Sequence, residues 1–332
     1  MLPHRTLPRR TLLAGIGASL VPAAAFAASS GEAGFAAFLN AVRNEARRDG
    51  IRNATLSRAL DGLRPDPAVL ARAAHQPEFT MTWARYRGLL ISDQRITNGR
   101  AAEARVRGLL ARISARYSVA PGVILGIWGV ESSFGTISGQ FQVVRSLATL
   151  GASGHRSAFF RSELIDALRI LDAGDITAAH MLGSYAGAMG QPQFMPSSYL
   201  HYAVDFDGSG RRDIWNDTAD VLASIANYLA RSGWRRGEPW GQRVVLPLHY
   251  RADGPVRRSV GDWHAAGIRA GGGRGLAPAA MPARLLLPDG IEGAAAGEAY
   301  LVYPNFNAIR RYNPSDFYAL AVGLIGDRIL GI

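Results

Sequence analysis

Apolar residues spaced three and four positions apart constrain this chain most strongly, because that spacing is the mark of amphipathic helices. One such stripe consists of Phe38, Leu39, Val42 and Ala46, and Gly50 follows where a helix is expected to end. The same periodicity predicts further helices at about 53–62, 98–117, 122–134, 156–173, 218–231 and 314–330. We therefore expect a mainly α-helical (α+β) fold.

The segment after Trp234 has a different pattern. Short apolar runs at 243–248 and 283–287 are separated by glycine and proline, as is typical of strands joined by turns. These runs predict a small β-rich insertion over 236–300. The glycines between 271 and 275 lack the strand-then-helix setting of a phosphate loop, which favours a connector over a nucleotide site.

The first 27 residues have the pattern of an export signal. Arg9-Arg10 precede an apolar run from Leu12 to about Pro22, and Ala25-Phe26-Ala27 suits cleavage by signal peptidase after Ala27. The run is too short to span a membrane, which takes about 20 residues. The arginine pair resembles a twin-arginine signal, with an ordinary Sec signal as the alternative. Both routes predict a periplasmic protein.

Charge and cysteine content narrow the partners. The 37 basic and 26 acidic residues give a formal net charge of +11, which attracts polyanions of several kinds. Because the chain shows no zinc-finger spacing, basic heptad helix or aromatic RNA-binding signature, we expect no nucleic-acid partner. The absence of cysteine excludes disulfides, thiolate metal sites and a lipid-modified N-terminal cysteine. We expect neither a lipid anchor nor a transmembrane span.

A single carboxylate, Glu131, falls at the end of an apolar helix. Pro121 suits the first helical position, and the residues between it and Glu131 are almost all apolar. Burial in such a place raises the pKa of a carboxyl group toward the value that a general acid needs. A structural glutamate that pairs with an arginine or bonds to nearby backbone is the alternative.

A second unusual block spans residues 183–199, where glycines and small residues allow close backbone approach. Ser184 and Gln193 carry hydrogen-bonding groups suited to sugar hydroxyls or an N-acetyl group, and Met189 and Phe194 supply apolar surface. We interpret the block as part of a sugar-binding cleft. A tight packing motif between a helix and a turn would use the same glycines.

The segment from Asp205 to Asp213 resembles an EF-hand calcium loop. Oxygen ligands stand at loop positions 1, 3, 5 and 9, a glycine stands at position 6, and position 7 offers a backbone carbonyl. These candidate ligands are Asp205, Asp207, Ser209, Asp213 and the carbonyl of Arg211. Position 12 is asparagine, so the closing ligand must come from elsewhere. We expect calcium in a structural role, with sodium or an empty acidic turn as alternatives.

Three separated blocks carry a family resemblance: 127–135 around Glu131, 187–198, and Ala226-Asn227-Tyr228. Together and in this order they resemble the B-type lytic murein transglycosylases, from about Phe35 to the end of the chain. Gln191-Pro192 departs from the tyrosine–glycine pair of some relatives. The resemblance implies a lysozyme-like helical core at 121–235, an N-terminal helical subdomain at 28–120, the β-rich insertion, and a final segment, 301–332, that returns to the core.

The resemblance also implies an activity. The enzyme would cleave the β-1,4 bond between N-acetylmuramic acid and N-acetylglucosamine in peptidoglycan without water, with Glu131 as its one catalytic carboxylate. Ser184, Gln193, Tyr228, Asn305 and Tyr312 would line the sugar cleft, and Asp220 would complete the calcium loop. We expect a monomer whose partner is the glycan strand.

One carboxylate is enough for this chemistry. The 2-acetamido group of the muramic acid can attack its own anomeric carbon, and the tethered 6-hydroxyl can then close a 1,6-anhydro ring. Glu131 would act first as acid and then as base. A hydrolytic muramidase and a non-catalytic peptidoglycan-binding scaffold remain the alternatives.

Overall fold

The computed structural model describes residues 31–74, 81–154, 156–248, 250, 257–272 and 275–332, so the expected export signal lies outside the described residues. Two compact units make up this part of the chain. The first comprises Phe79–Val130 and Ala226–Ile332, and the second comprises the described residues before Phe79 together with Glu131–Ile225.

Helices α5 (Trp83–Leu90), α6 (Asp93–Tyr117), α14 (Pro304–Tyr312) and α15 (Asp316–Leu330) belong to the first unit, with most of α7 (Pro121–Ser132). Helix α15 packs against α5, α6 and α14. Glycines bring α7 and α15 into backbone contact. A Cβ atom on Gly126 would lie 2.1 Å from the carbonyl oxygen of Val322, and one on Gly326 would lie 2.1 Å from that of Gly122. No side chain fits at these crossing points.

A small antiparallel sheet completes the first unit. Its strands are β3 (Gly241–Val245), β4 (Arg257–Ser259), β5 (Arg269–Ala270), β6 (Pro282–Leu286) and β7 (Tyr300–Val302), in the order β4-β6-β7-β3-β5. Short helices α12 (Val260–Ala265) and α13 (Gly290–Ala295) are inserted between strands. Val244, Trp263 and Leu301 belong to its buried apolar core. The expected β-rich insertion is present, and β3 and β6 coincide with the two predicted runs.

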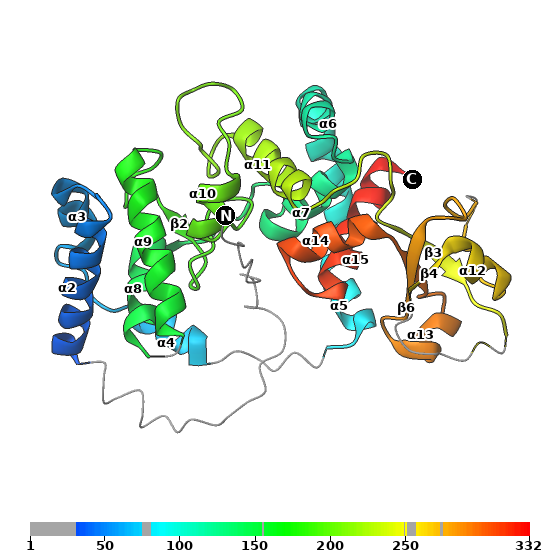
Figure 1. Ribbon diagram of the computed structural model, residues 1–332, viewed down its shortest axis with the longest axis horizontal. Helices are drawn as coiled ribbons and strands as arrows, with labels where there is room; N and C mark the ends of the chain where they lie inside the picture. The colour runs from blue at the N-terminus through cyan, green and yellow to red at the C-terminus, as the bar shows by residue number, and fades with distance from the viewer. Residues whose placement is uncertain (1–30, 75–80, 155, 249, 251–256, 273–274) are drawn as a thin grey trace, which may run out of the picture. The chain divides into compact units, whose positions relative to one another are not determined.

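The second unit is mostly helical. It contains α2 (Glu32–Arg48), α3 (Asn53–Leu60), α4 (Pro67–Ala74), α8 (Val143–Ala152), α9 (Ser157–Ala173), α10 (Pro196–Tyr202) and most of α11 (Thr218–Arg231). Helices α2, α8 and α9 pack against one another and run side by side in Figure 1. The strands β1 (Phe141–Gln142) and β2 (Leu182–Gly183) form a two-stranded antiparallel pair.

A buried carboxylate supports α10 in the second unit. Glu163 is 3% exposed and accepts hydrogen bonds from the backbone N–H and the hydroxyl of Ser197, at 2.9 and 2.7 Å. A carboxylate at this position satisfies a free N–H of the first helical turn and interacts favourably with the positive end of the helix dipole. The role of Glu163 is therefore structural.

Among the described residues, no single helix is both long and apolar enough to cross a bilayer. Helices α6 and α7 meet the length and composition criteria only as a pair bent by 114° at their junction.

Candidate active site

Glu131 occupies the last turn of α7 and is partly exposed. The preceding residues of that turn are fixed by Arg95, whose Nη1 donates a 2.6 Å hydrogen bond to the carbonyl oxygen of Gly129. Burial lowers the pKa of Arg95 from its usual value. A cation that bonds a carbonyl in the last turn of a helix interacts favourably with the helix dipole. Arg95 therefore ties the last turn of α7, which carries Glu131, to α6.

The chain turns sharply after α7. Ser133, Phe134 and Gly135 have φ values of 49°, 61° and 84°, all in the left-handed region. Non-glycine residues adopt this conformation at a cost of about 1 kcal/mol or more each, so the surrounding contacts must hold it. The Ser132 hydroxyl accepts a 3.1 Å hydrogen bond from the Gly135 N–H. A Cβ on Gly135 would also lie 2.6 Å from Oε1 of the Gln191 side chain. The φ of 84° favours glycine at this turn.

Glycines in the second block permit similarly close approaches. A Cβ on Gly183 would lie 2.0 Å from the carbonyl oxygen of Ala188, and one on Gly190 would lie 2.6 Å from that of Ile214. A Cβ on Gly139 would lie 2.2 Å from the carbonyl oxygen of Gly183. The composition of the block follows from this backbone packing.

Ser184 and Gln193 lie in this block and are partly exposed. The Ser184 hydroxyl accepts a 3.0 Å hydrogen bond from the Ala188 N–H, which leaves its own O–H free to donate elsewhere. Gln193 has a φ of 52°, and its Nε2 donates to the carbonyl oxygen of Gly190 at 2.8 Å. Local backbone bonds thus hold both side chains in place.

Met189 and Phe194 face the interior of the same turn. Both are 0% exposed, and their backbones exchange hydrogen bonds of 2.7 and 3.1 Å across an isolated antiparallel bridge. In this structure the two side chains form the core of the turn. Direct contact between either side chain and a sugar stays a prediction.

Tyr228, Asn305 and Tyr312 come together in the first unit. The rings of Tyr228 and Tyr312 are 4.7 Å apart between centroids, and the Tyr228 hydroxyl donates a 2.5 Å hydrogen bond to the carbonyl oxygen of Arg311. Asn305 and Tyr312 are each 0% exposed. The Asn305 amide accepts from the Arg235 N–H at 2.6 Å and donates to the carbonyl oxygens of Arg235 and Glu238 at 2.9 and 2.7 Å. This amide holds the chain that follows α11.

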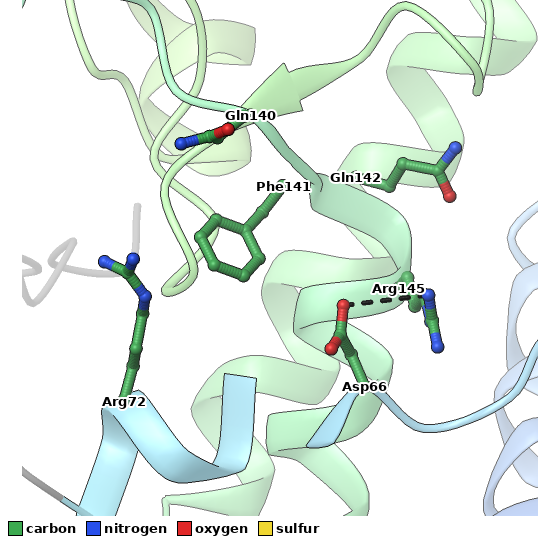
Figure 2. A pocket seen from close by; sticks show the side chains of 6 residues that line it. All are labelled: Asp66, Arg72, Gln140, Phe141, Gln142 and Arg145. Atoms are coloured by element: carbon green, nitrogen blue, oxygen red, sulfur yellow. Dashed lines mark ion pairs between the residues drawn. The ribbon is translucent and has the colours of Figure 1, made fainter. Parts of the chain in front are cut away.

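A polar cavity of about 360 Å³ lies beside β1 in the second unit (Figure 2). The Phe141 ring stands at its centre, with the guanidinium of Arg72 5.2 Å from the ring centroid. Arg145 lies 3.7 Å from the Asp66 carboxylate and bonds the carbonyl oxygens of Arg64 and Pro65 at 2.9 and 3.0 Å. Phe141 also meets the Tyr185 ring edge-on at 6.5 Å, so the cavity adjoins the strand that leads to Ser184. The sequence patterns did not indicate this cavity.

The expected calcium loop brings three carboxylates together. Oxygen atoms of Asp205, Asp207 and Asp220 lie within 4.8 Å of one another. Asp220 is 0% exposed, accepts hydrogen bonds from the N–H groups of Phe206 and Asp213 at 2.7 and 2.8 Å, and has its pKa raised to about 6, mainly by burial. A cation would offset the cost of gathering these charges, and hard oxygen ligands suit calcium. The residues therefore fit the expected metal.

The remaining predicted ligands are placed differently. Asp213 is not part of this group of described carboxylates. Its Oδ1 accepts from the N–H groups of Trp215 and Asn216 at 3.0 and 2.9 Å. The Ser209 hydroxyl donates to the carbonyl oxygen of Arg211 at 3.3 Å. Coordination by Ser209, Arg211 and Asp213 stays a prediction.

Comparison with known proteins agrees with these features. A family model described as "Transglycosylase SLT domain" matches residues 34–327. The chain is 34% identical to membrane-bound lytic murein transglycosylase B of Escherichia coli over 253 residues, which cover 74% of this chain and 67% of that protein.

The fold is also similar to solved structures of lytic transglycosylases. The chain is similar to SltB3 from Pseudomonas aeruginosa in complex with NAG-NAM-pentapeptide, with a TM-score of 0.85 and 42% identity over 90% of this chain and 80% of that one. It is also similar to the Escherichia coli lytic transglycosylase SLT35 in complex with calcium, with a TM-score of 0.74 and 31% identity over 89% of this chain and 92% of that one.

The predicted family and the mainly α, lysozyme-like fold class are both confirmed. The match extends over both compact units and includes the helix that carries Glu131. The chain belongs to the transglycosylase SLT family, among the B-type lytic murein transglycosylases.

Proposed function

We propose that this protein is a periplasmic lytic transglycosylase that cleaves the bond between N-acetylmuramic acid and N-acetylglucosamine in peptidoglycan and leaves 1,6-anhydro ends. The observation that carries the proposal is the family match over residues 34–327, joined to the similarity to a structure named for its NAG-NAM-pentapeptide complex. The position of Glu131 in the last turn of α7 supports it.

Glu131 is the proposed acid and base. In the first step its carboxyl proton passes to the glycosidic oxygen, and N-acetylglucosamine leaves as the muramic 2-acetamido oxygen bonds to the anomeric carbon. In the second step the ionised Glu131 takes the proton of the muramic 6-hydroxyl, whose oxygen displaces the acetamido oxygen and closes the anhydro ring. The tethered hydroxyl has a high effective molarity, which favours ring closure over attack by water.

Residues in each unit are proposed to bind the sugar or to support the residues that do. Ser184 and Gln193 are partly exposed polar groups fixed by local bonds, which suits contact with sugar. In the first unit, Tyr228, Asn305 and Tyr312 are proposed to contact sugar as well, and the bonding of Asn305 supports a positioning role for it. Met189 and Phe194 support the turn that carries Gln193.

Calcium is proposed to bind at Asp205, Asp207 and Asp220 and to stabilise the loop between α10 and α11. The gathered carboxylates and the similarity to a structure solved with calcium support this site. No step of the proposed chemistry requires a metal. We further propose that the protein acts as a monomer on glycan strands, after export by the twin-arginine or the Sec route.

The mass of the products tests the proposed reaction. The full chain is incubated with purified peptidoglycan, and the released muropeptides are analysed by mass spectrometry. Anhydro ends, lighter by one water than reducing ends, are the expected result. Reducing ends would identify a hydrolytic muramidase, and the absence of released muropeptides would identify a binding scaffold; either result overturns the proposal.

A further inference from the structure

A cavity of about 280 Å³ in the first unit is lined by four arginines: Arg235, Arg257, Arg284 and Arg311. They come from the segment after α11, from β4, from β6 and from the end of α14. No acidic residue is among the described residues that line it. Val302, Pro304 and Ala308 add apolar surface to the wall, which also includes the polar residues Ser232 and Asn307. We call this cavity the arginine pocket.

The charge of the arginine pocket is only partly neutralised. Arg284 pairs with Asp316 at 3.1 Å, but Arg310 uses the same carboxylate at 2.7 Å. Arg235 lies 3.7 Å from Glu238, beyond hydrogen-bond distance. Within the described part of the chain, no carboxylate pairs with Arg257 or with Arg311. The pocket therefore has an excess of positive charge.

Two of these arginines face each other across the sheet. Arg257 and Arg284 are direct partners in the register of β4 and β6. Like charges in directly opposed positions destabilise an antiparallel pair. An anion bound between them would remove this repulsion, so the fold keeps an unfavourable arrangement that a ligand would relieve.

Residues expected in the sugar cleft also hold the walls of this pocket. The Asn305 amide bonds the N–H and the carbonyl of Arg235, and the Tyr228 hydroxyl bonds the carbonyl of Arg311. Arg311 directly precedes Tyr312 in α14. The pocket and the proposed sugar-binding residues therefore share supporting contacts. Arg311 of the pocket is the sequence neighbour of the proposed sugar-binding residue Tyr312.

We propose that the arginine pocket binds the carboxylates of the peptidoglycan stem peptide. Guanidinium groups bind carboxylates through paired, charge-assisted hydrogen bonds. The apolar part of the wall suits the methyl groups of alanine. An inorganic anion has no alkyl group and would leave this surface uncovered. The inference rests on the proposed function, since it names how the same enzyme recognises the peptide part of its substrate.

Titration calorimetry with a synthetic stem pentapeptide tests the pocket without catalysis. The full chain is compared with the double variant Arg257→Gln, Arg311→Gln and with Arg112→Gln, a control at an exposed position of α6. The double variant should bind the peptide at least about tenfold more weakly, because it lacks two guanidinium groups that form charge-assisted hydrogen bonds with carboxylates. Arg112→Gln should bind like wild type. Amidation of the peptide carboxylates should weaken binding to wild type by a similar factor.

Three results would overturn the proposal: equal affinity of the double variant, equal affinity for the amidated peptide, or displacement of the peptide by inorganic phosphate at peptide-like concentrations. The last would identify a general anion site. Thermal unfolding checks that the double variant is folded, which we expect because removal of Arg257 relieves its repulsion with Arg284.

Turnover separates this inference from the proposed function. On strands that carry stem peptides, the double variant should raise KM with little change in kcat, while its cleavage of peptide-free strands should match that of Arg112→Gln. Equal KM values of the two variants on peptide-bearing strands would contradict the pocket. If wild type cleaves neither substrate, the proposed function fails, and the titration alone decides the pocket.

Discussion

Arg95 and Gly129 are joined by a 2.6 Å hydrogen bond from the guanidinium Nη1 to the carbonyl oxygen, two residues before Glu131. The bond crosses from the first turn of α6 to the last turn of α7. Because a proposed acid must be held within a fraction of an ångström of the bond it protonates, we predict that Arg95 has a positioning role in catalysis.

Replacement of Arg95 by glutamine should therefore lower kcat about tenfold to a hundredfold, with KM nearly unchanged. Arg95→Lys, which keeps a cationic donor, should recover part of the loss. Arg105→Gln, at an exposed position of the same helix, serves as the control. Steady-state kinetics on purified glycan strands provide the measurement. A purely structural role would instead lower the melting temperature and leave kcat per folded molecule intact.

Because α7 and α15 are in backbone contact, a single methyl group added at their crossing should lower the free energy of unfolding strongly. Gly126→Ala would place Cβ 2.1 Å from the Val322 carbonyl oxygen, and the helices must separate to relieve the clash. We expect a loss of about 1–3 kcal/mol or more in the free energy of unfolding. Gly108→Ala is the matched control, because a Cβ there meets nothing within 4 Å. It should raise stability by up to about 1 kcal/mol. Equal effects in urea unfolding would refute the close packing.

Glu163 offers a contrast with Glu131, because its two bonds to Ser197 make it a structural carboxylate. Glu163→Gln replaces one acceptor oxygen by a donor and should destabilise the protein by about 1–3 kcal/mol. The solvent-facing pair of Glu103 and Arg107 supplies the control, and Glu103→Gln should cost at most about 0.5 kcal/mol. Both variants should still form anhydro products. Loss of product from folded Glu163→Gln would mean that a second carboxylate takes part in the chemistry.

Removal of calcium should lower the melting temperature of the wild-type protein. The double variant Asp205→Ala, Asp207→Ala loses two of the three gathered carboxylates and should be insensitive to chelation. Differential scanning calorimetry with and without a chelator measures both. Similar shifts in the two proteins would show that any bound calcium lies elsewhere.

Long helices were predictable because their signals are local. The apolar stripe before Gly50 became α2, and Pro121 begins α7 as expected. The start of α6 was predicted five residues late, at 98. The helix begins at Asp93, because the Ser92 hydroxyl accepts a hydrogen bond from the Arg95 N–H and caps its first turn. The predicted helix at 314–330 is α15, but α14 before it was missed despite Pro304 at its first turn.

Short elements depend on contacts that a sequence pattern does not contain. Strand β7 is only three residues long, lies between β3 and β6, and has all three residues buried, so both faces of the sheet are covered there. A fully buried strand lacks the alternation that marks a half-exposed one. Its sequence therefore gave no period to detect.

The candidate site shows the same division. The close backbone approaches at Gly183 and Gly190 were foreseeable, since glycine is the residue that permits them. The burial of Asn305 was not, because an amide that bonds sugar and one that bonds backbone have the same sequence. The gathering of Asp220 with Asp205 followed from family resemblance, whereas the turn that occupies Asp213 depends on local geometry.

The product formed by Glu131→Gln shows whether Glu131 is the acid and base of the reaction. Wild type and variant are incubated with the same peptidoglycan, and the muropeptides are analysed by mass spectrometry after both proteins are shown to unfold at similar temperatures. Wild type should form 1,6-anhydromuropeptides and the variant none, since glutamine can neither give nor take the required proton. Substantial anhydro product from a folded Glu131→Gln protein would contradict this role of Glu131.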